Sequence, residues 1–200
     1  MDDVVIIGGG IIGVATAYFL SKEGRKVKVI EKDPSYKEAS FPLSLGGFRR
    51  QFFQKENILL GKFARDFIFQ IPELLKTKKN PNPTASMVPN GYLLMFGPEH
   101  AEEQYRALEN HKECGAGTKN IKGSELSKVF SYINDEGIET ATYTDDKSEG
   151  WIDPFMFHGA LKSKATELGA EFIKGEVKEI SEINAKIIIS AAGCWTKKIL

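Results

Sequence analysis

The chain has 200 residues, 42% of them hydrophobic, and its 27 basic residues balance 27 acidic ones. This length and composition allow a buried core, and the balanced charge gives no electrostatic reason to expect a nucleic-acid partner. The two cysteines, Cys114 and Cys194, lie far apart without metal-ligand spacing, which predicts reduced thiols and no metal site. Without an apolar run near the roughly 20 residues that a bilayer requires, we expect no membrane span.

The chain begins with a predicted βαβ unit. Residues 4–7 are a short β-branched run typical of a buried strand, and residues 11–23 show a helical pattern that ends at Gly24. Residues 26–31 alternate as a second strand would. Strand, helix and strand within about thirty residues predict a parallel pair with a right-handed crossover.

A turn-rich segment, residues 33–54, predicts an extended loop, and residues 56–76 predict a helix that Pro72 kinks or splits. Phe63, Phe67 and Ile71 recur on one face of this helix, which indicates core packing. A polar connector then precedes further predicted elements, which are a strand at 91–97, helices at 98–116 and 122–130, and a strand at 138–146.

The C-terminal part predicts one more helix and two more strands. Asp153 as N-cap, Pro154 in the first turn and Gly169 at the stop define the helix, and residues 171–180 and 185–193 predict the strands. His158 lies inside this helix, where spacing indicates partial burial, so we do not assign it as a base. We expect His100 and His111, in the polar helix at 98–116, to lie on the surface.

Three glycines follow the first strand in the spacing Gly8-x-Gly10-x-x-Gly13. The first allows a tight turn, the second lets the backbone approach a pyrophosphate, and the third allows the helix to pack closely on the strands. The start of the helix adds free N–H groups and a partial positive charge. The pattern predicts a dinucleotide site.

Glu31, at the end of the second strand, lies close to the position of the acid expected in such a site. A carboxylate there accepts hydrogen bonds from both ribose hydroxyls of an adenosine and would repel a 2′-phosphate, which disfavours NADP. The motif itself leaves FAD and NAD as alternatives.

The stretch "DVVIIGGGIIGVATAYFLSKEGRKVKVIEKDP" resembles the N-terminus of the D-amino-acid oxidase superfamily of FAD-dependent oxidoreductases. The stretches "ASFPLSLGGFRRQF", "EGWIDPFMFHGAL", "ELGAEFIKGEV" and "IIISAAGCW" extend the resemblance over essentially all residues. They are similar to one branch, which contains FAD-dependent oxidoreductase domain proteins linked to respiratory complex I assembly and sarcosine-oxidase-like relatives.

The resemblance implies FAD as the cofactor and an α/β fold: a Rossmann-like FAD-binding domain with a parallel sheet and an inserted, incomplete α+β substrate domain. We expect residues 1–83 plus 150–200 to form the FAD-binding domain and residues 84–149 to form part of the substrate domain. Members of the superfamily are about twice as long, so we expect this chain to lack the C-terminal half. The positions that the resemblance assigns to FAD are Gly8, Gly10, Ile11, Ile12, Gly13, Glu31, Lys32, Ser40, Ser44, Leu45, Gly46, Gly47, Val177, Ala192, Gly193 and Trp195.

The resemblance further implies chemistry on a small amine or an N-methyl or D-amino acid, with oxygen or an electron carrier as acceptor. Arg49 and Arg50 are the candidate catalytic residues, because a cation is required near the reduced flavin and at a substrate carboxylate. The loop at 33–54 contains no histidine for a covalent link, which favours non-covalent FAD. The alternative is an FAD-binding assembly factor for a respiratory complex, without turnover.

We expect a cytoplasmic protein, because the first predicted strand starts almost at residue 1 and leaves no room for a targeting segment. A location in the mitochondrial matrix is the alternative.

Overall fold

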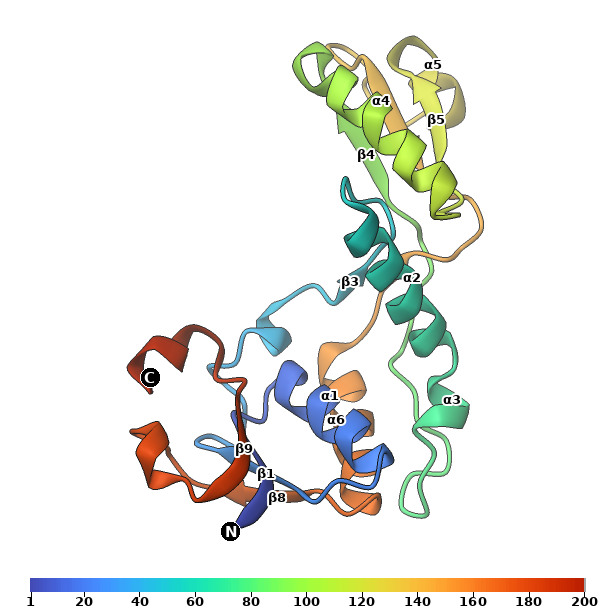
Figure 1. Ribbon diagram of the computed structural model, residues 1–200. Coiled ribbons are helices and arrows are strands. Elements are labelled where there is room, and N and C mark those ends of the chain that lie inside the picture. Colours follow the sequence, from blue (N-terminus) through green and yellow to red (C-terminus); the bar gives the residue numbers. More distant parts are fainter. Residues whose placement is uncertain (200) are drawn as a thin grey trace. The chain divides into compact units, whose positions relative to one another are not determined.

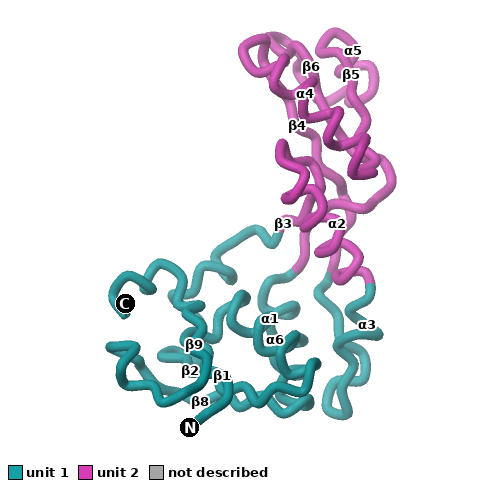
Figure 2. The backbone as a smooth tube through the Cα atoms, viewed as in Figure 1, with its two compact units in different colours: residues 1–46, 70–86, 153–200 teal, residues 47–69, 87–152 magenta. Residues whose placement is uncertain are grey.

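The computed structural model describes residues 1–199, which form two compact units. The first unit consists of Met1–Gly46, Gln70–Ser86 and the chain from Asp153 onward, and the second consists of Gly47–Phe69 and Met87–Ile152 (Figure 2). Residues 47–69 fall in the second unit, whereas the sequence-based division placed them in the FAD-binding domain. The division into an FAD-binding domain and a substrate domain stays a prediction.

The first unit contains a four-stranded parallel sheet in the order β8-β2-β1-β9. Its strands are β1 (Asp2–Ile7), β2 (Val27–Glu31), β8 (Glu171–Lys174) and β9 (Ala185–Ser190). Val4 of β1 pairs with Val27 on one side and with Ile187 on the other. Because β1 lies inside the sheet, its residues from Val4 to Ile7 are all buried. The expected α/β fold with a parallel sheet is confirmed.

Two helices, α1 (Ile11–Lys22) and α6 (Pro154–Glu167), pack against each other beside this sheet (Figure 1). Each has the ends that the sequence predicts. Gly24 follows α1 in a left-handed conformation with φ +77°, and the Asp153 side chain caps α6 by accepting a hydrogen bond from the Met156 N–H at 2.8 Å. Local sequence signals therefore set the boundaries of both helices.

The predicted helix at 56–76 is split at Pro72, as expected. Helix α2 (Lys55–Phe69) belongs to the second unit and α3 (Ile71–Leu74) to the first. Proline lacks an N–H group and crowds the preceding turn, so the break falls just before it.

The second unit contains a three-stranded antiparallel sheet in the order β4-β6-β5. Its strands are β4 (Leu93–Phe96), β5 (Lys119–Lys122) and β6 (Thr140–Tyr143), accompanied by α4 (Pro98–Glu113) and α5 (Gly123–Val129). The buried residues Ile121, Leu126 and Ala141 form a core cluster. A second, two-stranded sheet pairs β3 (Gly47–Phe48) with β7 (Gly150–Trp151).

Short 3-10 helices complete the described chain: η1 (Phe41–Leu43), η2 (Ile180–Glu182) and η3 (Gly193–Lys198). The strand predicted at 171–180 ends at Lys174, and η2 lies in the turn between β8 and β9. Within residues 1–199, no helix combines the length and apolarity needed to cross a bilayer.

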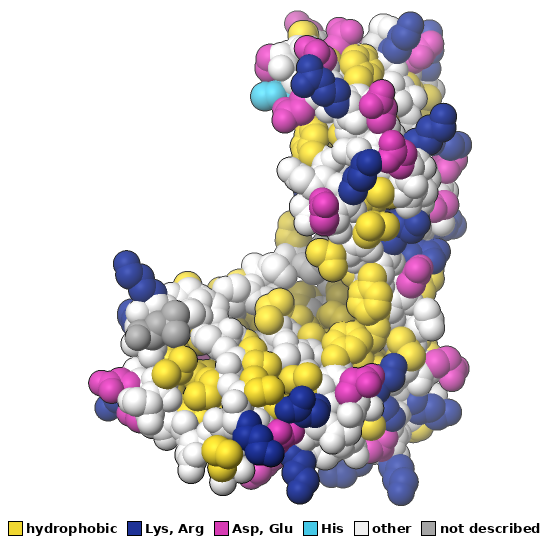
Figure 3. Space-filling view, in the orientation of Figure 1, with side chains coloured by type: hydrophobic (Ala, Val, Ile, Leu, Met, Phe, Trp, Pro, Cys, Tyr) yellow, Lys and Arg dark blue, Asp and Glu magenta, His cyan; other side chains and the backbone are white. Residues whose placement is uncertain are grey.

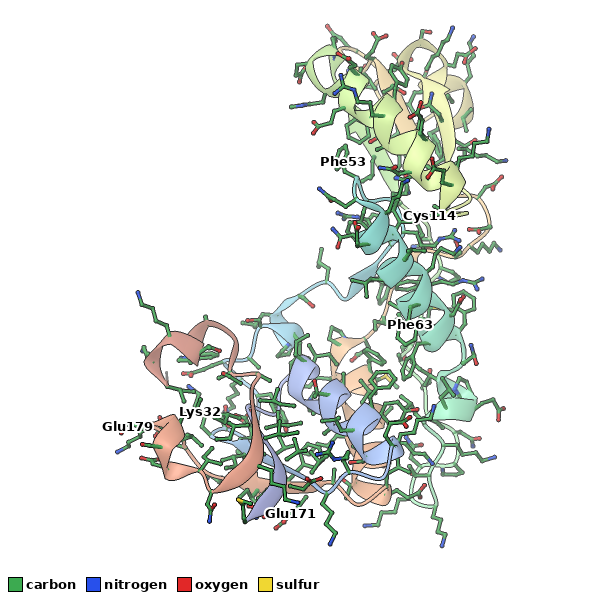
Figure 4. All side chains as sticks on the ribbon, viewed as in Figure 1. Lys32, Phe53, Phe63, Cys114, Glu171 and Glu179 are labelled. Atoms are coloured by element: carbon green, nitrogen blue, oxygen red, sulfur yellow. The ribbon has the colours of Figure 1, made fainter. Side chains whose placement is uncertain are left out.

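Two sequence-based predictions about side chains are wrong. Phe63, predicted to lie in the core, is 57% exposed on α2 (labelled in Figure 4), whereas Phe67 and Ile71 are buried as expected. His111, predicted to lie on the surface, is 3% exposed, and its Nε2 lies 2.8 Å from the carbonyl oxygen of Phe52. The cause is that α4 buries the face that carries Ala101, Gln104 and His111.

Candidate functional site

A cavity of about 360 Å³ lies at the carboxyl ends of all four strands of the parallel sheet. Open parallel sheets bind ligands at this edge, because the loops and helix N-termini that follow the strands gather there. The lining comes from the first unit alone: Ile7, Gly8, Gly10, Ile11, Ile12, Ile30, Glu31, Lys32, Asp33, Tyr36, Glu38, Ala39, Ser40, Phe41, Gly175, Glu176, Val177, Lys178, Ala191, Ala192, Gly193, Trp195, Lys198 and Ile199.

The three glycines of the motif have different environments. Gly8 has φ +99°, and a Cβ built there would lie 2.6 Å from the carbonyl oxygen of Ala191. A Cβ at Gly13 would lie 1.9 Å from the carbonyl oxygen of Gly8, so this glycine allows α1 to pack on the loop. A Cβ at Gly10 would meet nothing within 4 Å, although Gly10 lines the cavity. Only Gly10 therefore leaves space on the ligand side.

Helix α1 begins at this loop without a side-chain cap. Gly10 is its N-cap residue, and the first turn carries no acidic side chain. The first bond of the helix runs from the Val14 N–H to the Gly10 carbonyl at 2.9 Å, so the N–H groups of Ile11, Ile12 and Gly13 have no partner within the helix. This end can bind an anion such as a pyrophosphate.

Glu31 lies beside the glycine loop at the end of β2. Its Oε2 accepts a hydrogen bond from the Gly9 N–H at 2.6 Å, and its Oε1 accepts one from the Asp33 N–H at 2.8 Å. Each carboxylate oxygen has two lone pairs, so both can accept a further bond from a ligand hydroxyl. Glu31 thus holds the loop and still offers acceptors to the cavity.

The cavity wall beyond Glu31 combines a cation with an indole ring. The Lys32 Nζ lies 4.1 Å from the centre of the Trp195 ring and 3.6 Å from the Glu38 carboxylate (Lys32 is labelled in Figure 4). Val177 completes this part of the lining. Apolar and aromatic walls with few polar groups are typical of sites that hold a planar base.

Sequence reasoning missed two aromatic residues of the lining, Tyr36 and Phe41. Tyr36 is 7% exposed, has φ +56°, and its hydroxyl accepts a hydrogen bond from Lys162 Nζ at 3.0 Å. Phe41 is 8% exposed. The signal in the sequence was the pair of aromatic residues in the turn-rich loop after β2.

His158 is also buried under the glycine loop, with 3% exposure, and its Nε2 lies 2.8 Å from the Gly9 carbonyl oxygen. Burial lowers the pKa of His158 below its usual value, against the opposing effects of the Gly9 hydrogen bond and the Glu31 charge. The ring is therefore neutral near pH 7.

The cavity includes most of the positions that the resemblance assigned to FAD. Gly13 lies outside the lining and packs against Gly8 instead. Ser44, Leu45 and Gly46 also lie outside it, and Gly47 belongs to the second unit. The assigned positions that line the cavity are Gly8, Gly10, Ile11, Ile12, Glu31, Lys32, Ser40, Val177, Ala192, Gly193 and Trp195.

The two candidate catalytic arginines lie in the second unit and differ in their surroundings. Arg50 is 7% exposed and forms an ion pair with Asp146 at 2.9 Å. Burial raises the pKa of Asp146, but hydrogen bonds from Ser148 and Arg50 outweigh it and lower this pKa below its ordinary value. The Arg49 guanidinium lies over the ring of Phe52 at 4.8 Å.

Among residues 1–199, no group of three or more His, Cys, Asp or Glu side chains has an arrangement that could hold a metal ion. Charged side chains of both signs are mixed across the face that Figure 3 shows, in line with the balanced composition.

Comparison with known proteins places this geometry in context. Residues 3–200 match the family model described as FAD dependent oxidoreductase. FAD-dependent oxidoreductase domain-containing protein 1 from Xenopus laevis is 38% identical over 238 residues, covering 98% of this chain and 47% of the relative. The Bos taurus protein of the same name is 32% identical, covering 99% and 48%. The chain thus spans about half the length of these relatives.

Solved structures agree with this result. L-proline dehydrogenase from P. horikoshii superposes with a TM-score of 0.80 at 27% identity, covering 99% of this chain and 54% of that protein. Glycine oxidase from Geobacillus kaustophilus superposes with a TM-score of 0.78 at 20% identity, covering 98% and 56%, which shows a shared fold. The prediction of FAD from the sequence is confirmed at the level of the family. The chain belongs to the family of FAD-dependent oxidoreductases.

Proposed function

We propose that the cavity of the first unit holds FAD without a covalent link, and that the protein oxidises a small amine or an N-methyl or D-amino acid. The observation that carries the proposal is the glycine loop at the carboxyl edge of the sheet, with Glu31 beside it. The family match supports the cofactor, and the similarity to L-proline dehydrogenase, at 27% identity, supports an amino-acid substrate.

The residues present fit the adenosine diphosphate part of FAD. The N–H groups at the start of α1 and the open space at Gly10 suit the pyrophosphate, and Glu31 suits the ribose hydroxyls. Lys32, Val177 and Trp195 suit the base, because they give an apolar and aromatic wall with one cation. The cavity volume of about 360 Å³ lies in the range of ligand sites.

When bound, FAD supplies the acceptor for a hydride equivalent from the carbon next to the substrate nitrogen. The contribution of the chain is to bind, orient and supply charge. Of the two candidate cations, Arg50 is engaged by Asp146 and Glu149 in the second unit. Among the described residues Arg49 forms no ion pair, so we assign the role of binding a substrate carboxylate to Arg49.

The proposal is tested on the full-length protein. We expect a yellow protein that releases FAD on denaturation, which would also exclude a covalent link. Anaerobic mixing with sarcosine, dimethylglycine, proline, glycine and D-alanine should bleach the flavin band with at least one of them. Bound FAD that none of these amines reduces would contradict the enzymatic part of the proposal.

A second candidate is an assembly factor for a respiratory complex that binds FAD without turnover. The chain resembles the branch linked to complex I assembly, and this resemblance favours the second candidate. Relatives named FAD-dependent oxidoreductase domain-containing protein 1 reach 38% identity, above the 27% of the proline dehydrogenase. Under this candidate the flavin is bound but stays oxidised in the anaerobic test. A location in the mitochondrial matrix would suit this candidate, whereas a cytoplasmic location suits the amine oxidase.

For the amine oxidase, we propose that oxygen or an electron carrier reoxidises the flavin. The two acceptors differ in a simple assay of the reduced protein. Rapid reoxidation in air, with formation of hydrogen peroxide, supports oxygen, whereas reoxidation that requires an added artificial acceptor supports a carrier.

A further inference from the structure

We propose that His158 is a positioning residue for the pyrophosphate: by holding the Gly9 carbonyl, it turns the Gly10 N–H toward the cavity. The proposal rests on FAD binding in this cavity. His158 reaches the loop from α6 and lies 149 residues further along the chain than Gly9.

The His158 ring is fixed on several sides. It stacks on Phe41, with ring centres 4.5 Å apart and an interplanar angle of 15°, and meets the edge of Tyr36 at 4.5 Å. With 3% exposure, the ring has no water to compete for its hydrogen bond. A carbonyl oxygen can only accept, so the Nε2 carries the proton and donates to Gly9 at 2.8 Å.

The N–H group of Gly9 also forms a hydrogen bond with a side chain. It donates to Glu31 Oε2 at 2.6 Å, and a Cβ at Gly9 would lie 3.2 Å from the Glu31 Cβ and 3.3 Å from the Tyr36 hydroxyl. Both polar groups of Gly9 therefore bond to side chains, one from β2 and one from α6. This residue of the loop has its orientation set by Glu31 and His158 together.

Planarity of the peptide bond transmits that orientation to Gly10. The bond between Gly9 and Gly10 is trans, so the Gly9 carbonyl and the Gly10 N–H point in opposite directions. The carbonyl points at the buried His158 ring, while Gly10 lines the cavity. Among the described residues no hydrogen bond uses the Gly10 N–H, which leaves it free for an anionic ligand.

The charged and titratable groups around His158 are consistent with a neutral donor. Lys162, from the same helix, lowers its pKa; Glu31, from β2, raises it; the Tyr36 hydroxyl bonds to Lys162. Burial has the largest effect and keeps the ring uncharged. The neutral ring with its single proton on Nε2 gives one fixed direction to the Gly9 carbonyl.

Two variants separate hydrogen bonding from packing. The measurement is the dissociation constant of FAD for the full-length apoprotein, from quenching of flavin fluorescence. His158→Phe keeps an aromatic ring against Phe41 but removes the donor, so we expect affinity to fall about tenfold, the typical effect of one lost hydrogen bond. His158→Gln places an amide N–H near the former Nε2 position, so we expect affinity within about threefold of the wild type.

If His158→Phe does not fold, His158→Asn replaces it, because the shorter amide has the same chemistry as Gln but does not reach Gly9. The expected order of affinity for FAD is then the wild type first, His158→Gln close to it, and His158→Asn clearly weaker. Wild-type affinity in Phe or Asn, or an equal loss in all variants, would overturn the positioning role in favour of packing. A wild-type protein that binds no FAD would overturn the proposed function itself, and the positioning role with it.

Discussion

The fully buried Glu149 accepts a hydrogen bond from the backbone N–H of Arg50 at 2.6 Å, although 99 residues separate the two. Its other oxygen accepts from the Gln51 Nε2 at 2.8 Å and from the Thr144 hydroxyl at 2.9 Å. One carboxylate thus ties the segment that carries both candidate arginines to the end of β6. We therefore expect these hydrogen bonds to Glu149 to hold the conformation of that segment.

Replacing Glu149 with Ala should destabilise the protein strongly. The change leaves three donors unpaired and the Arg50 charge without one of its carboxylates, which in other proteins costs about 3–5 kcal/mol. Urea unfolding measures the loss. Lys119→Ala, which removes the exposed ion pair with Asp145, is the matched control and should change the midpoint little. A small effect of both variants would contradict the structural role of Glu149.

Alanine substitutions at two glycines of the loop should change different properties, FAD binding in one case and stability in the other. Gly10→Ala places a methyl group in open space at an ordinary φ of −64°, so we expect normal unfolding but loss of FAD binding. Gly13→Ala places a methyl group 1.9 Å from the Gly8 carbonyl, so we expect destabilisation of about 1–3 kcal/mol from overpacking. Urea unfolding and FAD titration of both variants give the four values needed. Equal behaviour of the two variants would be inconsistent with these environments.

Glu31→Gln should weaken FAD binding by about tenfold or more. The amide places its own NH₂ group toward either the Gly9 or the Asp33 N–H, so one partly buried donor loses its acceptor and the ribose loses one as well. Glu171→Gln removes an exposed carboxylate from the neighbouring strand β8 and serves as the control (Figure 4). In an FAD titration, the affinity of this control should equal that of the wild type.

Stability should fall as the pH drops below about 6.5. Burial lowers the pKa of both His111 and His158 in the folded protein, so the unfolded chain binds protons first as the pH falls. Each histidine adds at most about 1.4 kcal/mol per pH unit, between its folded pKa and its unfolded value near 6.5. Above that value the effect is absent.

Urea unfolding at several pH values between about 5 and 8 measures this slope. His111→Gln should reduce it, whereas His100→Gln, at an exposed position, should leave it unchanged. A slope that His111→Gln does not alter would show that this histidine does not contribute.

Local signals in the sequence were enough to predict most elements. Asp153 and Pro154 start α6 through contacts within one turn, and Pro72 breaks a helix through its own ring. Strand β5 was missed because Ile121 is its only buried residue, so it shows no clear alternation. It forms because β6 provides a partner, which is information outside the segment itself.

The candidate site likewise contains residues that the sequence predicted and residues that only tertiary structure brings to it. The spacing of the glycines and the position of Glu31 follow from the βαβ unit and were predicted. Tyr36 and His158 meet the loop only through tertiary structure, so spacing along the sequence could not connect them with it. His111 shows that a polar side chain does not always indicate the surface. A buried helix face can carry a polar side chain when a backbone carbonyl accepts a hydrogen bond from it.

The pairing of β1 with β9 has a consequence for biosynthesis. β1 leaves the ribosome before both of its partner strands and finds β2 within about thirty residues, but its other edge pairs with residues 185–190. At roughly 5–20 residues per second, that edge stays uncovered for about 10–40 s, with Val4 and Ile6 beside it. The growing chain therefore exposes a β-branched edge, a potential site for pairing with another chain, until residues 185–190 have been synthesised.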